Sequence, residues 1–206
     1  MITTIYLVRH TQTVGNIERR LTGRKDYEIT TDGKKYIELL TERLKNIRFD
    51  NIYSSITGRA IKTIKPLAKI CGKEIIKSEE LCEMNFGIYE GMSWEEVNEI
   101  NSKITENHKK TNEIMGIPEQ ECTEDVACRM YDYIRRISIE NEGKTILIGS
   151  HGVAIESFLR KVTGEKFFTK IKEYSQKNTT VNIIEYDSEF DKFKVVLLND
   201  FSHLVE

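Results

Sequence analysis

Prolines and glycines are scarce in this sequence. Only 2 prolines and 12 glycines occur among 206 residues, and there is no Gly/Ser-rich linker, internal repeat or low-complexity tract. Segments of those kinds usually separate independent domains. Their absence predicts one domain over residues 1-206, which is long enough to bury a real core.

Long hydrophobic runs are also missing. No stretch approaches the roughly 18 uninterrupted apolar residues of a membrane span, and the first residues, MITTIYLVRH, lack the basic start and apolar run of a signal peptide. Neither C-x-x-C spacing nor a zinc-type histidine pattern accompanies the four cysteines, Cys71, Cys82, Cys122 and Cys128. We expect a cytoplasmic protein with reduced thiols.

Charge of one sign is not in excess. The 31 Lys and Arg residues nearly balance the 33 Asp and Glu residues, which gives a net charge of -2. A protein whose main partner is nucleic acid or an anionic membrane usually carries a strongly basic surface. The composition therefore favours neither of these partners.

Short apolar runs alternate with helical patterns along the chain. The runs lack strict alternation, which is typical of strands buried on both faces. This order predicts an α/β fold of three layers, with a mostly parallel central sheet and helices on both faces. The predicted strands cover 3-8, 51-54, 74-77, 144-149, 180-186 and 193-198, and the predicted helices contain Leu39 to Ile47, Ile61 to Ile70, 123-139 and 153-162.

Residues 92-120 interrupt this alternation. Ser93-Trp94-Glu95-Glu96 has the form of a capping box, which predicts the start of an additional helix. We interpret 92-120 as a small helical insertion over the active-site edge of the sheet, serving as a lid or specificity element.

Two histidines directly follow predicted strands. Arg9-His10 follows IYLV, and His151 follows ILIGS. Ligands of open α/β sheets bind at the carboxyl ends of the strands. Either histidine alone is more simply a polar residue at a loop mouth, but a guanidinium beside two imidazoles suits an anion such as phosphate better than a metal ion. Arg59, near the start of the helix after 51-54, would add a second cation at a helix N-terminus, where phosphate is favoured.

Several motifs together resemble the histidine phosphatase superfamily, also called the phosphoglycerate mutase-like family. The resemblance spans nearly the whole chain and rests on five motifs in the order that is typical of the family. These motifs are Leu7-Val8-Arg9-His10-Thr11-Gln12-Thr13 with Asn16, Thr22-Gly23, Ser54-Ser55 with Gly58-Arg59-Ala60, Glu83 with Phe86-Gly87 and Glu90-Gly91, and Ser150-His151-Gly152.

The resemblance implies a role for each matching residue. His10 would be the nucleophile that holds the phosphoryl group as a phosphohistidine. Arg9, Arg59 and His151 would bind the equatorial phosphate oxygens, as magnesium does in other enzymes. Glu83 would be the general acid and then the general base. The substrate pocket would be completed by Asn16, Thr22, Gly23 and Gly152, with no metal and no cofactor.

These roles require Glu83 to be protonated while His10 is neutral. Their ordinary pKa values, about 4.3 and about 6.5, lie in the opposite order, so the pocket must shift at least one of them. The family usually has glycine where this chain has Thr11. We expect an altered turn or an additional hydroxyl contact at that position.

The acid motif, Glu83-Met84-Asn85-Phe86-Gly87, is similar to that of the phosphatase members and favours a phosphatase. The resemblance implies a metal-independent enzyme that acts on small phosphorylated metabolites, and we expect a monomer or a homodimer. A cofactor-dependent phosphoglycerate mutase and a catalytically silent phosphate-binding relative are the alternatives. The candidate substrates are sugar phosphates, phosphoglycerate and nucleoside-like esters such as alpha-ribazole phosphate.

Two groups of residues could contact the substrate or serve only the fold. The first is a basic run that is either a binding site for a second anionic group or a solvated loop: Arg19, Arg20, Arg24 and Lys25. The second is a set of lid residues that either contact the leaving group or are ordinary core and solvated helix positions: Met92, Trp94, His108 and Met115.

Overall fold

The computed structural model describes residues 1–100, 102, 120–165 and 174–204. Its centre is a six-stranded sheet of order β3-β2-β4-β1-β5-β6. The first four strands pair parallel, whereas β5 is antiparallel to β1 and β6 is antiparallel to β5. The mixed, mostly parallel sheet confirms the predicted α/β class. The strands are Ile2–Arg9 (β1), Asn51–Ser55 (β2), Ile75–Ser78 (β3), Thr145–Ser150 (β4), Val181–Asp187 (β5) and Lys192–Asp200 (β6).

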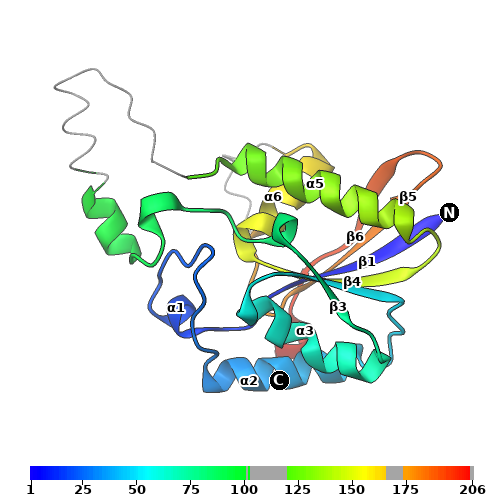
Figure 1. Cartoon of the computed structure of the whole chain (residues 1–206), viewed down its shortest axis with the longest axis horizontal. Coiled ribbons are helices and arrows are strands. Elements are labelled where there is room, and N and C mark those ends of the chain that lie inside the picture. The colour runs from blue at the N-terminus through cyan, green and yellow to red at the C-terminus, as the bar shows by residue number, and fades with distance from the viewer. Residues whose placement is uncertain (101, 103–119, 166–173, 205–206) are drawn as a thin grey trace.

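Helices cover both faces of the sheet (Figure 1). Side chains alternate between the faces of β1, as strand geometry requires. Ile5 and Leu7 pack among residues of α5 and α6, whereas Val8 packs among residues of α2 and α3, and all three are fully buried. The long helices are Thr31–Leu44 (α2), Gly58–Cys71 (α3), Thr123–Glu140 (α5) and Gly152–Thr163 (α6). Short elements are α1 (Val14–Ile17), η1 (Glu79–Leu81), η2 (Gly87–Tyr89) and η4 (Ser202–Leu204).

The ends of these elements follow local signals. Thr30 caps α2 by accepting a hydrogen bond from the Gly33 N–H, and Gly72 ends α3 in the left-handed region at φ 62°. Ile47, which the apolar spacing placed in the first helix, lies beyond its end at Leu44. No helix within the described ranges is long and apolar enough to span a membrane.

The start of the insertion is helical, as the capping box predicted. The Ser93 N–H donates to Glu96 Oε2 at 2.7 Å, and the Glu96 N–H donates to Ser93 Oγ at 3.2 Å. Residues 94–100 form the helix that follows. Most of the remainder of the predicted 92-120 insertion lies outside the described residues, including His108 and Met115.

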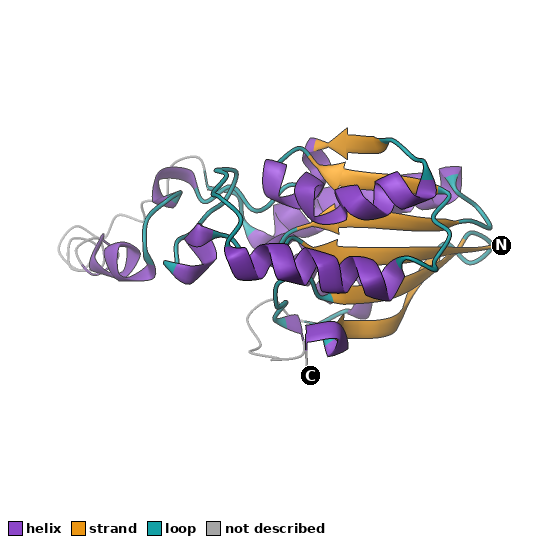
Figure 2. Ribbon diagram, turned by 90° about the horizontal axis from the view of Figure 1, so that it is seen from below, coloured by secondary structure: helices purple, strands orange, loops and turns teal. Residues whose placement is uncertain are grey.

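The carboxyl ends of the parallel strands meet at one edge of the sheet. In Figure 2 their arrowheads point toward the part of the molecule that holds the 94–100 helix. The register places Arg9 of β1 opposite Ser150 of β4, so the residues that follow the two strands begin side by side. The main-chain N–H of His10 donates to the Ser150 carbonyl at 2.9 Å. Topology alone therefore brings His10 and His151 together.

Candidate active site

His10 is held with one ring nitrogen occupied. Its side chain is buried, and Nδ1 lies 2.6 Å from the Thr11 carbonyl oxygen. A carbonyl only accepts hydrogen bonds, so Nδ1 carries the proton and Nε2 keeps its lone pair. Burial, together with the charges of Arg59 and Arg9, lowers the pKa of His10 well below 6.5. The ring is therefore neutral, and its Nε2 lone pair is available.

His151 follows β4 and lies beside His10, with ring centroids 5.2 Å apart. Its Nδ1 is 3.1 Å from an Arg59 nitrogen, which only donates, so Nδ1 accepts and Nε2 donates to Ser55 Oγ at 2.7 Å. Burial is the largest cause that lowers the pKa of His151 well below 6.5, and Arg59 is the next. Ser55, at the end of β2, thus fixes the orientation of this second ring.

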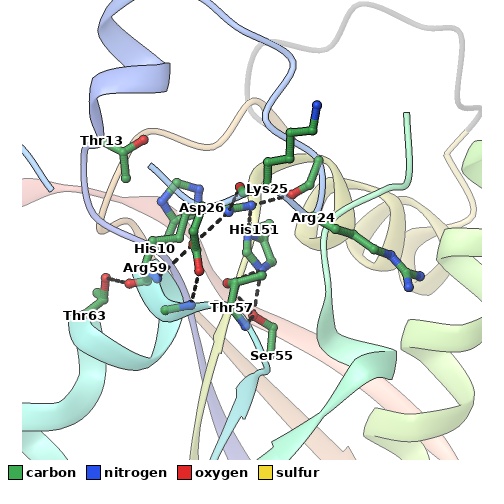
Figure 3. Close-up of polar contacts among 12 residues, drawn as sticks. His10, Thr13, Arg24, Lys25, Asp26, Ser55, Thr57, Arg59, Thr63 and His151 are labelled. Carbon is green, nitrogen blue, oxygen red and sulfur yellow. Dashed lines mark hydrogen bonds and ion pairs between the residues drawn. The ribbon is translucent and has the colours of Figure 1, made fainter. Parts of the chain in front are cut away.

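Arg59 is the largest fully buried side chain among the described residues and stands in the first turn of α3. Its NH1 donates to the Lys25 carbonyl and to Asp26, and its NH2 donates to the Gly23 carbonyl at 2.6 Å and to His151 (Figure 3). The Nε–H of Arg59 is buried with no partner in the described part of the chain.

Arg9 shows the same incomplete pairing. Its NH1 donates to the Gln176 carbonyl, whereas its Nε–H is buried without a partner among the residues described. Burial lowers the pKa of Arg9, Glu83 opposes this shift and Arg59 adds to it. Arg59 is buried and Arg9 is half-buried, and each has a buried Nε–H without a partner, so together they favour an anion with several acceptor oxygens.

Glu83 faces the start of α6. Its Oε1 accepts from the Ala154 N–H at 2.9 Å and from the Met84 N–H at 3.0 Å, and its Oε2 accepts from the Val153 N–H at 3.2 Å. A helix N-terminus offers such free N–H groups. Glu83 is 6% exposed and lines the adjoining cavity.

Three of the four predicted pocket residues, Asn16, Thr22 and Gly23, lie between β1 and α2, whereas Gly152 is the first residue of α6. The Asn16 side-chain oxygen accepts from the Thr13 N–H at 3.0 Å and from Asn178 Nδ2 at 3.2 Å. Thr22 is nearly buried, and Gly23 has φ 50°, where a Cβ atom would lie 2.0 Å from Glu90 Oε1. Position 23 therefore favours glycine, because another residue would be strained at this φ and would displace the Glu90 carboxylate.

A cavity of about 570 Å³ opens beside these residues. His10, Arg59 and His151 do not line it, because they are buried next to Arg9. Its wall includes predicted site residues and residues of the basic loop and the insertion: Arg9, Asn16, Arg19, Arg20, Thr22, Glu83, Trp94, Gly152 and Glu156.

The basic run divides into two pairs. Arg19 and Arg20 line the cavity. Lys25 Nζ instead donates to the Glu90 carbonyl at 2.7 Å, and the main-chain N–H of Arg24 donates to the Glu90 carboxylate at 2.9 Å. Of the lid residues, Trp94 lines the cavity, whereas Met92 packs against a small apolar cluster.

Asp26 was not identified from the sequence. Its Oδ2 accepts from the Gly58 N–H and its Oδ1 from Arg59 N–H groups, so it caps α3 and holds the Arg59 guanidinium at once. The one available signal was an acidic residue directly after Arg24-Lys25, which by itself is typical of a solvated loop. Gln176 and Asn178 were also missed, because nothing local distinguishes them. Within the described ranges, no three His, Cys, Asp or Glu side chains are placed to share a metal ion.

A comparison with known families matches residues 5–200 to the model of the histidine phosphatase superfamily (branch 1). The chain belongs to this superfamily. The match covers both histidines, Arg9, Arg59 and Glu83.

Individual members of the superfamily carry different names. Phosphoglycerate mutase-like protein 4 of Arabidopsis thaliana is 28% identical over 98% of this chain and 87% of its own. YhfR of Bacillus stearothermophilus has a TM-score of 0.85 at 28% identity, over 98% of this chain and 99% of its own. Phosphoserine phosphatase of Entamoeba histolytica, solved in complex with 3-phosphoglyceric acid, has a TM-score of 0.78 at 25% identity, over 98% and 100%. Mutase and phosphatase names thus both occur among the relatives.

Proposed function

We propose that this protein is a metal-independent phosphomonoester hydrolase that acts through a phosphohistidine on a small phosphorylated metabolite in the cytoplasm. The observation that carries the proposal is the state of His10. It is neutral, its Nε2 is free, and it lies beside Arg9 and Arg59, which each retain a buried, unpaired Nε–H.

In the first step, His10 Nε2 attacks phosphorus, an N–P bond forms and the P–O bond to the alcohol breaks. Arg9, Arg59 and His151 offset the charge on the equatorial oxygens. Glu83 donates its proton to the departing oxygen. The alcohol leaves, and the imidazole carries the phosphoryl group.

In the second step, water attacks the phosphohistidine. Glu83, now a carboxylate, takes a proton from that water, the N–P bond breaks, and inorganic phosphate leaves. His10 returns to its starting form, and no external acceptor or cofactor is consumed. The two roles require a neutral His10 and a protonated Glu83, and the lowered pKa of His10 provides the first of these protonation states.

Phosphoglycerate mutation is the second candidate. Arg19 and Arg20 line the cavity and could bind the carboxylate of a phosphoglycerate. In that case the phosphohistidine would pass its phosphoryl group to a substrate hydroxyl rather than to water. We favour hydrolysis because of the acid motif around Glu83, while the relatives named as mutases support the alternative.

Phosphate release from p-nitrophenyl phosphate in excess EDTA tests the proposal, with wild type compared with His10→Ala. We expect turnover in EDTA that the variant loses by at least about 10³-fold, as expected when a covalent nucleophile is removed. A parallel assay on 3-phosphoglycerate separates the candidates, because a mutase forms 2-phosphoglycerate much faster than it releases phosphate. Absence of turnover on a panel of sugar phosphates, phosphoglycerates, phosphoserine and nucleoside-like esters would favour the silent relative.

A further inference from the structure

Arg129, on α5, donates hydrogen bonds to the main chain at and before Glu83. Its side chain is 14% exposed. NH1 donates to the carbonyls of Glu80 at 2.8 Å and Cys82 at 2.9 Å, and NH2 donates to the carbonyl of Glu83 itself at 3.2 Å. Three carbonyls of one short segment therefore share a single guanidinium.

Glu121 completes this arrangement. Its two carboxylate oxygens accept from Arg129 Nε at 2.9 Å and NH2 at 3.0 Å, which is a bidentate ion pair. The Asn85 N–H donates to Glu121 Oε2 at 2.7 Å, and the Glu121 N–H donates back to the Asn85 carbonyl at 2.9 Å. The Arg129–Glu121 pair thus forms hydrogen bonds with the main chain both before and after Glu83.

The segment from Cys82 to Asn85 belongs to no helix or strand, so it has no regular hydrogen-bonding ladder of its own. On one side, the α6 N–H groups of Val153 and Ala154 orient the Glu83 carboxylate. On the other side, Arg129 fixes the main-chain carbonyl of the same residue. The distance from the Glu83 carboxyl to a bound ester depends on both supports.

We propose that Arg129, held by Glu121, is a positioning residue for Glu83: it sets the place from which Glu83 delivers its proton to the leaving oxygen. This inference rests on the proposed function, because it assigns Glu83 as the general acid. Arg129 itself does not line the cavity of the candidate site, so it acts on the reaction without touching the substrate.

A comparison of two leaving groups distinguishes a positioning role for Arg129 from a purely structural one. An alkoxide is a poor leaving group and needs the proton from Glu83, whereas p-nitrophenolate is stabilised by its ring and leaves with little help. A displaced general acid therefore slows the cleavage of an alkyl phosphate more than that of an aryl phosphate. A general loss of active structure would lower kcat/KM for both esters by the same factor.

The experiment measures kcat/KM for glycerol phosphate and for p-nitrophenyl phosphate in full-length wild type, Arg129→Gln, Arg129→Lys and Arg135→Gln. Arg135 is the matched control, because it also lies on α5 and forms a bidentate ion pair, with Asp191 at 2.6 and 2.7 Å, away from Glu83. For Arg129→Gln we expect about a 30- to 100-fold loss on the alkyl ester, as for a misplacement of about 1 Å, and a loss below about 5-fold on the aryl ester. Arg129→Lys, which keeps the charge but not the fork, should recover part of the loss.

Glu83→Gln should reproduce this selective loss, and adding Arg129→Gln to it should cost little more, because the two residues act as one unit. Equal losses on both esters, or no loss, would overturn the inference while the proposed function stands. If Arg129→Gln does not fold, Glu121→Gln carries the same test with the same expected selectivity. An inactive wild type, unchanged by His10→Ala, overturns the proposed function, and the inference with it.

Discussion

Thr11 stands where the family usually has glycine after the histidine, and its hydroxyl explains how the chain accommodates it. Oγ1 donates to the Gly33 carbonyl at 2.7 Å, and the Thr11 N–H donates to Thr63 Oγ1 at 2.9 Å. The additional hydroxyl contact that the sequence suggested is therefore present. It ties the His10 loop to the first turn of α2, where Gly33 is buried.

Thr11→Val should lower the free energy of unfolding by about 1–3 kcal/mol, because the Gly33 carbonyl loses a buried donor while the volume is nearly preserved. Urea denaturation measures the change. Thr11→Ser keeps the hydroxyl and serves as the control. Equal stability of the two variants would show that the hydroxyl contact contributes nothing.

The two buried histidines, His10 and His151, also make stability depend on pH. Folding lowers the pKa of His10 and of His151 well below 6.5, mainly by burial, whereas the unfolded chain takes up protons near pH 6.5. Below that pH the unfolded state binds more protons than the folded state. His203, whose pKa burial and Arg43 lower to about 4, acts in the same direction.

We therefore expect the stability to be complete above about pH 6.5 and to fall as the pH drops below it, by up to about 1.4 kcal/mol per pH unit for each buried ring. Urea denaturation at a series of pH values between about 7.5 and about 5.5 measures the slope. His10→Ala should have a shallower slope than wild type. A slope that His10→Ala leaves unchanged would mean that His10 titrates alike in both states.

At the scale of elements, the site is built on the starts of two helices. Asp26 and the Arg59 side chain occupy the first turn of α3, and the Glu83 carboxylate occupies the first turn of α6. Gly152 is the first residue of α6, and a Cβ atom there would lie 3.3 Å from Arg9 Nε and 3.4 Å from Arg9 Cζ. Glycine at this position allows the helix to approach the guanidinium closely.

Gly152→Ala should therefore lower kcat/KM by about 10-fold, equivalent to about 1.4 kcal/mol, because the Arg9 guanidinium must shift by a few tenths of an ångström. Its effect on the unfolding free energy should be small, since alanine favours helix more than glycine does.

Gly72→Ala at the end of α3 is the contrasting control. No atom lies within 4 Å of its added Cβ, but its φ is 62°. It should cost about 1 kcal/mol of stability and leave kcat/KM unchanged. Steady-state kinetics and urea denaturation of both variants check the two opposite patterns. A loss of activity in both, or in neither, would contradict the prediction.

At the scale of the molecule, the sequence predicted which residues meet because they follow the ends of neighbouring strands. His10 and His151 meet because parallel strands β1 and β4 end at one edge, and Arg59 joins them because α3 follows β2 there. Contacts between loops were not predictable in the same way. Asp26 meets Arg59 across 33 residues and Arg129 meets Glu83 across 46, and neither pair leaves a periodic signal in the chain.

The antiparallel direction of β5 relative to β1 likewise could not be predicted from the sequence, because an apolar run does not indicate whether the strand next to it is parallel or antiparallel. The roles of the site residues and of the lid remain predictions.

The proximity of Arg9 and Arg59 at one edge of the sheet lowers the stability of the whole fold. Arg9 and Arg59 are close enough for Arg59 to lower the pKa of Arg9, and both leave an Nε–H unpaired. Such groups are destabilising until an anion satisfies them. On the proposed function, we expect the fold without ligand to be less stable than the fold with phosphate bound.

Arg9→Met is the direct test, because methionine fills similar space without charge. In phosphate-free buffer its free energy of unfolding should equal or exceed that of wild type by up to about 1–3 kcal/mol, because the variant removes a buried N–H without a partner and the repulsion from Arg59. Wild type should gain about 2.7 kcal/mol when inorganic phosphate is raised to about 100 times its Kd, and Arg9→Met should lose most of this gain. Arg135→Gln, whose ion pair with Asp191 is exposed, should keep it. A destabilised Arg9→Met that still responds to phosphate would show instead that Arg9 supports the fold rather than the ligand.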